Sequence, residues 1–163
     1  MKRIITVLSL IMLVCILFSS CGQAERKDTV SMYDLNKAMS GNAGFGEMTY
    51  VSSSDDGAAE KFEHLSDFDY SKIDAFFMNF AKDGSVSSDE VAVVALKSES
   101  DAADMVASLN KHLEYRKSLY RNYGPEQLPK LEKALVFSSG RYAVLIVADN
   151  PSAIKSAFYD FIR

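Results

Sequence analysis

The stretch Val91-Ala92-Val93-Val94-Ala95-Leu96 is the clearest structural signal in the chain. It is apolar throughout, half of its residues are β-branched, and polar residues flank it, which is typical of a buried β-strand. A long amphipathic helix follows, which Ser98 or Ser100 caps and Gly124-Pro125 ends. The apolar stripe of this helix is Ala102, Met105, Val106, Leu109, Leu113, Leu119 and Tyr120.

A second strand and helix follow the same order further along the chain. A shift of 51 residues lays Val93-Val94-Ala95-Leu96 on Val144-Leu145-Ile146-Val147. Asn150 then caps a last helix, with Pro151 at its first position. A weaker strand leads each pair, so the pattern indicates a ββα unit that is used twice. Chance similarity of two amphipathic strand-to-helix turns is the alternative.

The weaker strands complete the expected sheet. Residues 135–137 and 142–147 predict a hairpin around Ser138-Ser139-Gly140-Arg141. Residues 71–81 fit a strand by alternation, but their phenylalanines also fall at helical spacing, so a helix remains open. These elements predict an α+β fold, a small two-layer sandwich with an antiparallel or mixed sheet and helices on one face.

The first residues have the layout of a secretory signal. Lys2 and Arg3 precede the apolar run from Ile4 to Phe18, whose 15 residues are fewer than the roughly 20 that cross a bilayer. The box Phe18-Ser19-Ser20-Cys21 closes it and resembles a bacterial lipoprotein signal. That resemblance implies a thioether-linked diacylglycerol on Cys21. The chain is therefore expected to be anchored by lipid to the cell membrane, on its extracytoplasmic face.

Two alternatives concern the same segment. Cys15 is the other possible lipid acceptor, although cleavage before it would leave Ile16-Leu17-Phe18 at the mature end. The signal would alternatively remain as an uncleaved anchor with two incidental cysteines. Cys21 is the favoured lipidation site because small residues, Ser19 and Ser20, stand just before it.

Cleavage after residue 20 changes the charge and the available chemistry. The whole chain has 18 basic residues and 22 acids, and loss of Lys2 and Arg3 leaves 16 against 22. This acidic balance argues against nucleic acid as a partner. Only Cys21 remains of the two cysteines, so the mature chain is expected to have neither a disulfide nor a cysteine metal site.

The expected organisation has three parts. Residues 1–20 form the signal peptide. Residues 21–66 form a tether and a loosely organised region, in which a helix capped by Thr29 or Ser31 carries the apolar residues Met32, Leu35 and Met39. Residues 67–163 form the α+β domain.

No catalytic constellation, cofactor motif or metal motif is recognised in the sequence. The two histidines, His64 and His112, stand alone, and His112 is expected to be partly buried or interfacial. The turn acids Asp83, Asp89 and Glu90 are expected to be solvated. A tentative binding surface lies at the end of the long helix, although packing at the edge of the core would explain the same residues: Tyr115, Arg116, Tyr120, Arg121 and Tyr123.

Three segments in order resemble one protein family. They are Ser88-Asp89-Glu90-Val91-Ala92-Val93, then Tyr123-Gly124-Pro125-Glu126-Gln127, then the run from Gly140 to Val147. Behind a lipoprotein signal, these segments resemble the domain-of-unknown-function family DUF4358. The resemblance covers about residues 67–162. It implies a small lipid-anchored protein of Gram-positive bacteria and carries over no active-site residue.

These observations favour a non-enzymatic lipoprotein that binds a protein, a peptide or an envelope component. One alternative is a lipid-anchored envelope hydrolase, which requires acids or a Ser-His pair that converge in a pocket. The other is capture of a small ligand as a transporter accessory, which requires an apolar pocket with a few polar groups. A partner-binding module should instead expose an apolar patch.

Overall fold

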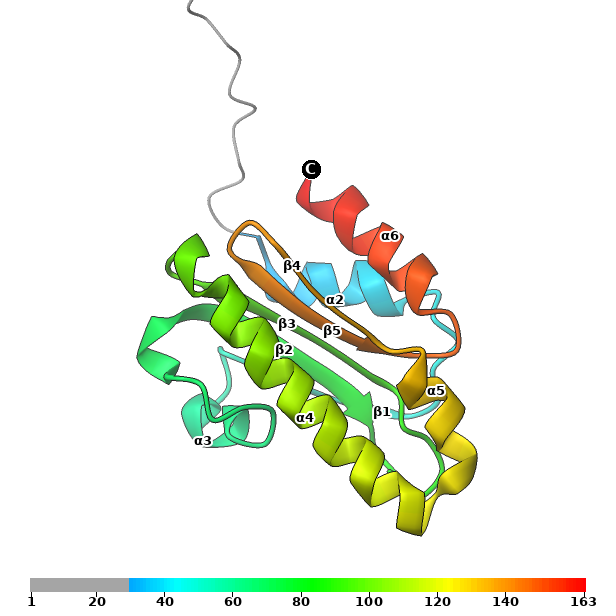
Figure 1. Ribbon diagram of the computed structural model, residues 1–163. Helices are drawn as coiled ribbons and strands as arrows, with labels where there is room; N and C mark the ends of the chain where they lie inside the picture. The colour runs from blue at the N-terminus through cyan, green and yellow to red at the C-terminus, as the bar shows by residue number, and fades with distance from the viewer. Residues whose placement is uncertain (1–29) are drawn as a thin grey trace, which may run out of the picture.

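In the computed structural model, which describes residues 30–163, five strands form one antiparallel sheet (Figure 1). The predicted signal peptide, Cys15, Cys21 and tether lie outside these residues. The strand order is β1-β2-β3-β5-β4. The strands are β1 (Met48–Ser52), β2 (Ile73–Ala81), β3 (Glu90–Leu96), β4 (Leu135–Ser139) and β5 (Tyr142–Val147).

Helices connect the strands and cover the sheet. The short 3₁₀ helices are η2 (Tyr70–Lys72), η3 (Glu99–Asp101) and η4 (Pro125–Gln127). The α-helices are α2 (Met32–Ser40), α3 (Ala58–Phe62), α4 (Ala102–Tyr123), α5 (Leu128–Glu132) and α6 (Pro151–Ile162). None of the helices within residues 30–163 is both long and apolar enough to cross a membrane.

The α+β fold class is confirmed, and the sheet is antiparallel rather than mixed. The ambiguous segment at residues 71–81 is mainly the strand β2, which pairs with β1 on one side and β3 on the other. The predicted hairpin is β4 and β5, with Gly140 at a φ of 53° in its turn. The helices that begin after Ser31 and Asn150 have the predicted caps: each side chain accepts a hydrogen bond from a backbone N–H three residues later.

The prediction of helices on one face is wrong, because β3 is buried on both of its faces. Val91, Val93 and Ala95 point to one face, whereas Ala92, Val94 and Leu96 point to the other. Helices α3, α4 and α5 cover the second of these faces, and α2 and α6 cover the first (Figure 1). A strand that is apolar on both faces needs cover on both. The fold therefore has three layers rather than two.

The order ββα does occur twice, as β2-β3-α4 and β4-β5-α6. The aligned residues Val93 and Val144 lie directly opposite each other on the paired central strands. The two helices nevertheless pack on opposite faces of the sheet. Leu96, the last residue of β3, points toward α4, whereas Ala148, which follows β5, points toward α6. The similarity of the two units therefore extends to their hairpins and does not include the placement of their helices.

Residues 30–66 are part of the fold, so the predicted boundary at residue 67 and the loose organisation before it are wrong. Strand β1 forms an edge of the sheet, and Leu35 of α2 and Phe62 of α3 are 0% and 1% exposed. The predicted helix itself is correct, since Ser31 caps α2 and Gly41 ends it. Strand β1 was not predicted because four of its five residues are only partly buried and the strand shows no clear alternation.

We expect Leu35→Ala to lower the free energy of unfolding by about 2–5 kcal/mol, because it opens a cavity between α2 and the sheet. Tyr33→Ala, two residues earlier on the other side of the same helix, removes a side chain that is 64% exposed and should change stability by about 0.5 kcal/mol or less. Urea denaturation followed by circular dichroism measures both. Equal stability of Leu35→Ala and the wild type would place α2 outside the cooperative core.

Candidate functional site

The loop that joins β2 to β3, residues 82–89, is held by side chains from α4 and η4. Tyr120 donates its hydroxyl to two loop carbonyls, at 2.8 and 3.2 Å, and Arg116 and Gln127 donate to one each, at 3.1 and 3.2 Å. The carbonyls that accept these bonds are those of Gly84, Val86, Ser87 and Ser88. The conformation of this loop is therefore set by the helices beside it, although its tip residue Val86 is 70% exposed.

Two of the three segments that carry the family resemblance meet at this loop. The backbone N–H and the hydroxyl of Ser88 both donate to Gln127 Oε1, at 3.1 and 3.3 Å. Asp89 binds Lys130 Nζ at 2.7 Å and accepts a hydrogen bond from the Ser87 hydroxyl, also at 2.7 Å. The segment from Ser88 to Glu90 and the segment that ends at Gln127 are thus one hydrogen-bonded unit.

Glu90, the first residue of β3, is the centre of a buried ion-pair cluster. Glu90 is 4% exposed, and both of its carboxylate oxygens lie 3.1 Å from His112 Nε2. Arg116, one turn further along α4, donates to the same carboxylate. Burial by itself raises the pKa of Glu90, but the positive charge of Arg116 and the hydrogen bonds from His112 and Arg116 outweigh it and lower the pKa.

The sequence predicts that the acids of this turn, Asp83, Asp89 and Glu90, are solvated. This is wrong for Asp89 and Glu90, which are 7% and 4% exposed. Asp83 does remain exposed at the turn. The physical reason is that β3 lies at the centre of the sheet. Glu90, its first residue, and Asp89, the residue before it, therefore lie beneath α4 and α5. The sequence contains no local signal for this, because Arg116 and Lys130 come from segments far along the chain.

Two adjoining cavities lie on either side of the loop. The first, which we call the α4 groove, has a volume of about 220 Å³ and is lined by His64, Met78, Phe80, Ala81, Gly84, Ser87, Glu90, His112 and Arg116. The second, which we call the end pocket, has a volume of about 640 Å³ and lies between the start of β1 and the loop. Ala81, Gly84 and Ser87 line both cavities, so the loop is their common wall.

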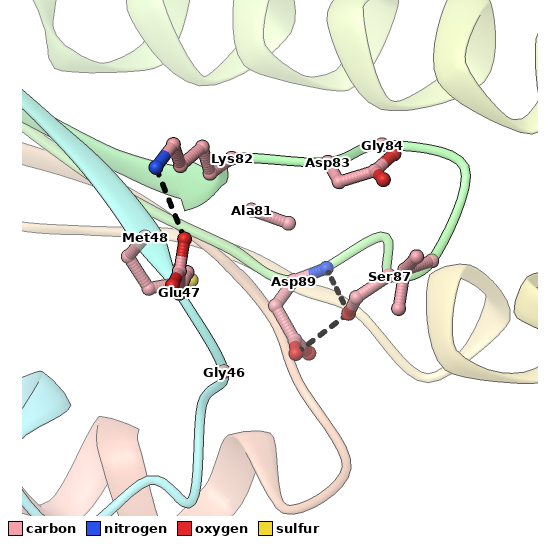
Figure 2. Close-up of a pocket in the computed structure, with 10 residues that line it drawn as sticks. Gly46, Glu47, Met48, Ala81, Lys82, Asp83, Gly84, Ser87 and Asp89 are labelled. Atoms are coloured by element: carbon pink, nitrogen blue, oxygen red, sulfur yellow. Dashed lines mark hydrogen bonds and ion pairs between the residues drawn. The ribbon is translucent and has the colours of Figure 1, made fainter.

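Figure 2 shows the end pocket, with Ala81 between two polar clusters. On one side Lys82 forms an ion pair with Glu47 at 3.0 Å. On the other side Asp89 forms its hydrogen bonds with Ser87. The charged side chains that line this pocket are therefore largely paired within the protein.

The structure divides the five residues of the tentative binding surface into two groups. Arg116 and Tyr120 turn inward, where the Arg116 guanidinium lies 5.5 Å from the centre of the Tyr120 ring. The Arg116 side chain also binds Glu90, and the Tyr120 hydroxyl binds the loop, so both polar groups are engaged within the protein. Tyr115 and Tyr123 are 62% and 83% exposed, and Arg121 is exposed as well.

Two further exposed apolar residues, which were not predicted from the sequence, lie at the same end of the molecule. Leu119 is 39% exposed instead of lying in the buried stripe of α4, and Val86 is 70% exposed. The spacing of Tyr115, Leu119 and Tyr123, four residues apart, was the available signal for an outer ridge on this helix. His112 is partly buried, as predicted, and His64 lies exposed at the rim of the α4 groove.

The polar groups of the site are arranged to hold the loop and the groove in shape. Both oxygens of Glu90 are occupied by Arg116 and His112. No group of three or more His, Cys, Asp or Glu side chains within residues 30–163 is placed to hold a metal ion.

A family model described as "domain of unknown function (DUF4358)" matches residues 47–148, which is more than half of the chain. The chain belongs to the DUF4358 family. The match confirms the predicted family and begins at residue 47, directly before β1, rather than near residue 67. The DUF4358 match spans all five strands and α3, α4 and α5, whereas α2 and α6 lie outside it. No curated protein and no solved structure matches the chain.

We expect Glu90→Gln to lower the free energy of unfolding at neutral pH by about 3 kcal/mol, because Arg116 then stays buried without a counter-charge. The lowered pKa of Glu90 means that its carboxylate stabilises the fold above the unfolded pKa of about 4.3, and that this stability is lost as the pH falls through the lower folded pKa. The difference between wild type and variant should therefore narrow in acid.

Urea denaturation over a series of pH values measures this difference. Glu114→Gln is the matched control, because Glu114 pairs with Lys117 at the surface and its side chain is 64% exposed. Its effect should stay below about 1 kcal/mol. Equal effects of the two substitutions would contradict the central position of Glu90.

We expect Tyr120→Phe to loosen residues 84–88 without unfolding the domain, because it removes the hydroxyl that binds two loop carbonyls. Hydrogen–deuterium exchange should become faster at these backbone amides and stay unchanged in β3. Tyr115→Phe, on the same helix with an exposed ring, is the control. Unchanged loop exchange in Tyr120→Phe would show that the loop is ordered without this contact.

Proposed function

We propose that this DUF4358 protein is a membrane-anchored, extracytoplasmic lipoprotein that acts as a binding module. The lipid on Cys21 holds it at the membrane, and the end of the sheet formed by the loop 82–89 and the C-terminal half of α4 contacts a partner. The proposed partner is a protein, a peptide or an envelope component.

One observation carries this proposal. The large apolar side chains exposed by residues 30–163 are Tyr33, Val86, Tyr115, Leu119 and Tyr123. All except Tyr33 belong to the C-terminal half of α4 or to the loop that α4 holds. Exposed apolar side chains that gather in one place are a feature of protein-binding surfaces, whereas scattered ones need no explanation.

The position of the helix α2 supports the same arrangement. Ser40, the last residue of α2, accepts a hydrogen bond at 3.2 Å from Asn79 near the end of β2, so α2 runs toward the loop end of the sheet. Helix α2 begins at Met32, at the other end of the sheet (Figure 1). An anchor that precedes Val30 would leave the loop end free to meet a partner.

The two alternative functions find weaker support. The end pocket, at about 640 Å³, falls within the range of small-ligand sites, which favours capture of a small ligand as the second candidate. Its lining charges are largely paired with other protein groups, so few remain to orient a ligand. A hydrolase would need a free carboxylate in a pocket. The carboxylate that lines the α4 groove belongs to Glu90, and Arg116 and His112 bind it.

Site-specific photocrosslinking in intact cells tests the proposed function. A benzoylphenylalanine placed at position 115 should form a discrete crosslinked product, and the same residue placed at position 33 should not. The two tyrosines are matched, at 62% and 64% exposed. Cys21→Ala should remove the chain from the membrane fraction and abolish the product.

Two outcomes contradict the proposal. Lipid labelling that persists in Cys21→Ala would show that the anchor is assigned wrongly. Turnover of an envelope substrate by the purified protein, abolished by a single carboxylate or serine substitution, would favour the hydrolase instead.

A further inference from the structure

We propose that two copies of this chain pair through β1, edge to edge and antiparallel, so that their two sheets become one. The partner is a second copy of the same chain, and the twofold axis of the dimer passes beside Tyr50. The inference goes beyond the proposed function, because it concerns the β1 edge of the sheet rather than α4 and the loop 82–89.

The outer side of β1 carries backbone groups that have no partner within residues 30–163. Strand β1 pairs only with β2. Two hydrogen bonds, from Ser53 N–H to Phe76 C=O at 3.0 Å and from Lys82 N–H to Glu47 C=O at 2.9 Å, show that the odd-numbered residues of this segment face β2. Because the direction alternates along an antiparallel pair, the even-numbered residues face outward. These are Met48, Tyr50 and Ser52.

Strand β1 has none of the usual features that keep a second strand from adding to a sheet edge. Such features are a proline, a charged side chain or a bulge in the edge strand. The strand reads Met48-Thr49-Tyr50-Val51-Ser52, and it pairs with β2 in one unbroken register. Of its outward groups, the Ser52 carbonyl accepts a turn hydrogen bond from Asp55 N–H at 3.1 Å. The others are available to another strand.

The sequence of β1 is complementary to itself about Tyr50. Two strands that pair about this residue place Met48 opposite Ser52 of the second copy, so that outward groups meet outward groups. Thr49 then lies opposite Val51 of the second copy, and two β-branched side chains make a favourable cross-strand pair. This register uses all three outward residues of each copy.

Charge disfavours the neighbouring registers. Only shifts by two residues keep the outward groups together. One such shift places Glu47 opposite Asp55 of the second copy, and like charges in this position are destabilising. The other places Glu47 opposite Val51 of the second copy and leaves Ser52 unpaired. The pairing about Tyr50 is therefore the specified one.

The other edge strand, β4, is less suited to self-pairing. Its turn of two residues closes at the pair of Ser139 and Tyr142, so only Val136 and Ser138 face outward. A twofold pairing of these two residues would place Lys133 opposite Arg141 of the second copy. Arg141 is paired with Asp74, whereas Lys133 forms no ion pair within residues 30–163. The edge at β1 is longer and has no charge to oppose.

Aromatic side chains stand beside the proposed axis. Tyr50 stacks on the buried ring of Phe77, with the ring centres 6.2 Å apart. Tyr33 of α2 packs edge-on against Tyr50, also at 6.2 Å, and is 64% exposed. The dimer sets the two Tyr50 side chains opposite each other, with Tyr33 at the border of the second copy. It thus gives a role to the large exposed apolar side chain that the proposed function does not use.

The charged residues around β1 allow this pairing. Two ion pairs neutralise acids at the ends of the strand, Glu47 with Lys82 at 3.0 Å and Asp55 with Lys61 at 3.2 Å. Residues 31–63 contain β1 and the helices on either side of it, and their other charged residues are Asp34, Lys37, Asp56, Glu60 and Glu63. Acids outnumber lysines in this set, so two copies repel each other at long range. Added salt should therefore strengthen the association.

Sedimentation velocity of the full chain tests the dimer, with detergent micelles in excess so that two copies rarely share a micelle by chance. A strand pair of this length is small beside interfaces of about 1,200–2,000 Å², so the dimer should be weak and its fraction should rise with protein concentration and with salt. Hydrogen–deuterium exchange by nuclear magnetic resonance tests the register. The amides of Met48 and Tyr50 should slow as the dimer forms, whereas those of Thr49 and Val51, which face β2, should be slow throughout.

A matched pair of proline substitutions separates the two edges of the sheet. Met48→Pro removes an outward N–H and places a ring toward the second copy, although a proline at such a position is tolerated in an edge strand. It should weaken dimerisation about tenfold or more. Ser138→Pro makes the same change at an outward position of β4 and should leave dimerisation unchanged. Circular dichroism confirms that each variant is folded, and the exchange pattern of the wild type decides if Met48→Pro is not.

Four results would overturn the inference. They are a wild-type chain that stays monomeric at every concentration, amides of Met48 and Tyr50 whose exchange does not change with concentration, an undiminished dimer in Met48→Pro, and equal loss of the dimer in the two proline variants. None of them affects the crosslinking test of the proposed function. A crosslink between two copies, from position 33 included, has the mass of two chains and is thereby distinguished from capture of another protein.

Discussion

The burial of β3 on both of its faces is the constraint on which the rest of the structure depends. Residues 91–96 are fully buried, and their side chains alternate between the two faces of the sheet. Each such side chain contributes about 1.5–3 kcal/mol only if its face is covered, apart from the smaller contribution of the alanines. One layer of helices would leave Val91, Val93 and Ala95 in water. Helices α2 and α6 therefore belong to the fold as firmly as α4 does.

The same constraint creates the candidate site. A strand in the middle of the sheet carries its first residue, Glu90, into the interior, and a buried carboxylate requires a cation or several hydrogen bonds. Helix α4 supplies them through Arg116 and His112, and Arg116 also donates a hydrogen bond to the carbonyl of Ser88. The burial of one charge thus connects the core to the loop that separates the two cavities. The ordered shape of the proposed recognition surface follows from a structural need of the sheet.

Local patterns predicted the elements that depend on local physics. The run from Val91 to Leu96 predicted a buried strand because a wholly apolar composition is unfavourable in an exposed strand. Ser31 and Asn150 predicted the starts of helices because their side chains cap the backbone N–H groups three residues later. Residues 71–81 were ambiguous, because alternation and helical spacing both fit their phenylalanines. Strand β1 was not predicted, because this short edge strand is stabilised by its pairing with β2 and does not require a regular alternation of apolar residues.

The sequence by itself determined the family, the α+β class, the hairpin at residues 135–147 and the long amphipathic helix, since each of these depends on residues close together in the chain. The predicted anchor at Cys21 is also a feature of local sequence. Only the tertiary structure decided which face each helix covers, and which aromatic and basic residues of α4 turn inward to Glu90 and the loop and which remain exposed. The physical reason is that burial and charge pairing are set by partners distant in the chain, and Arg116 becomes a core residue only because β3 brings Glu90 beneath it.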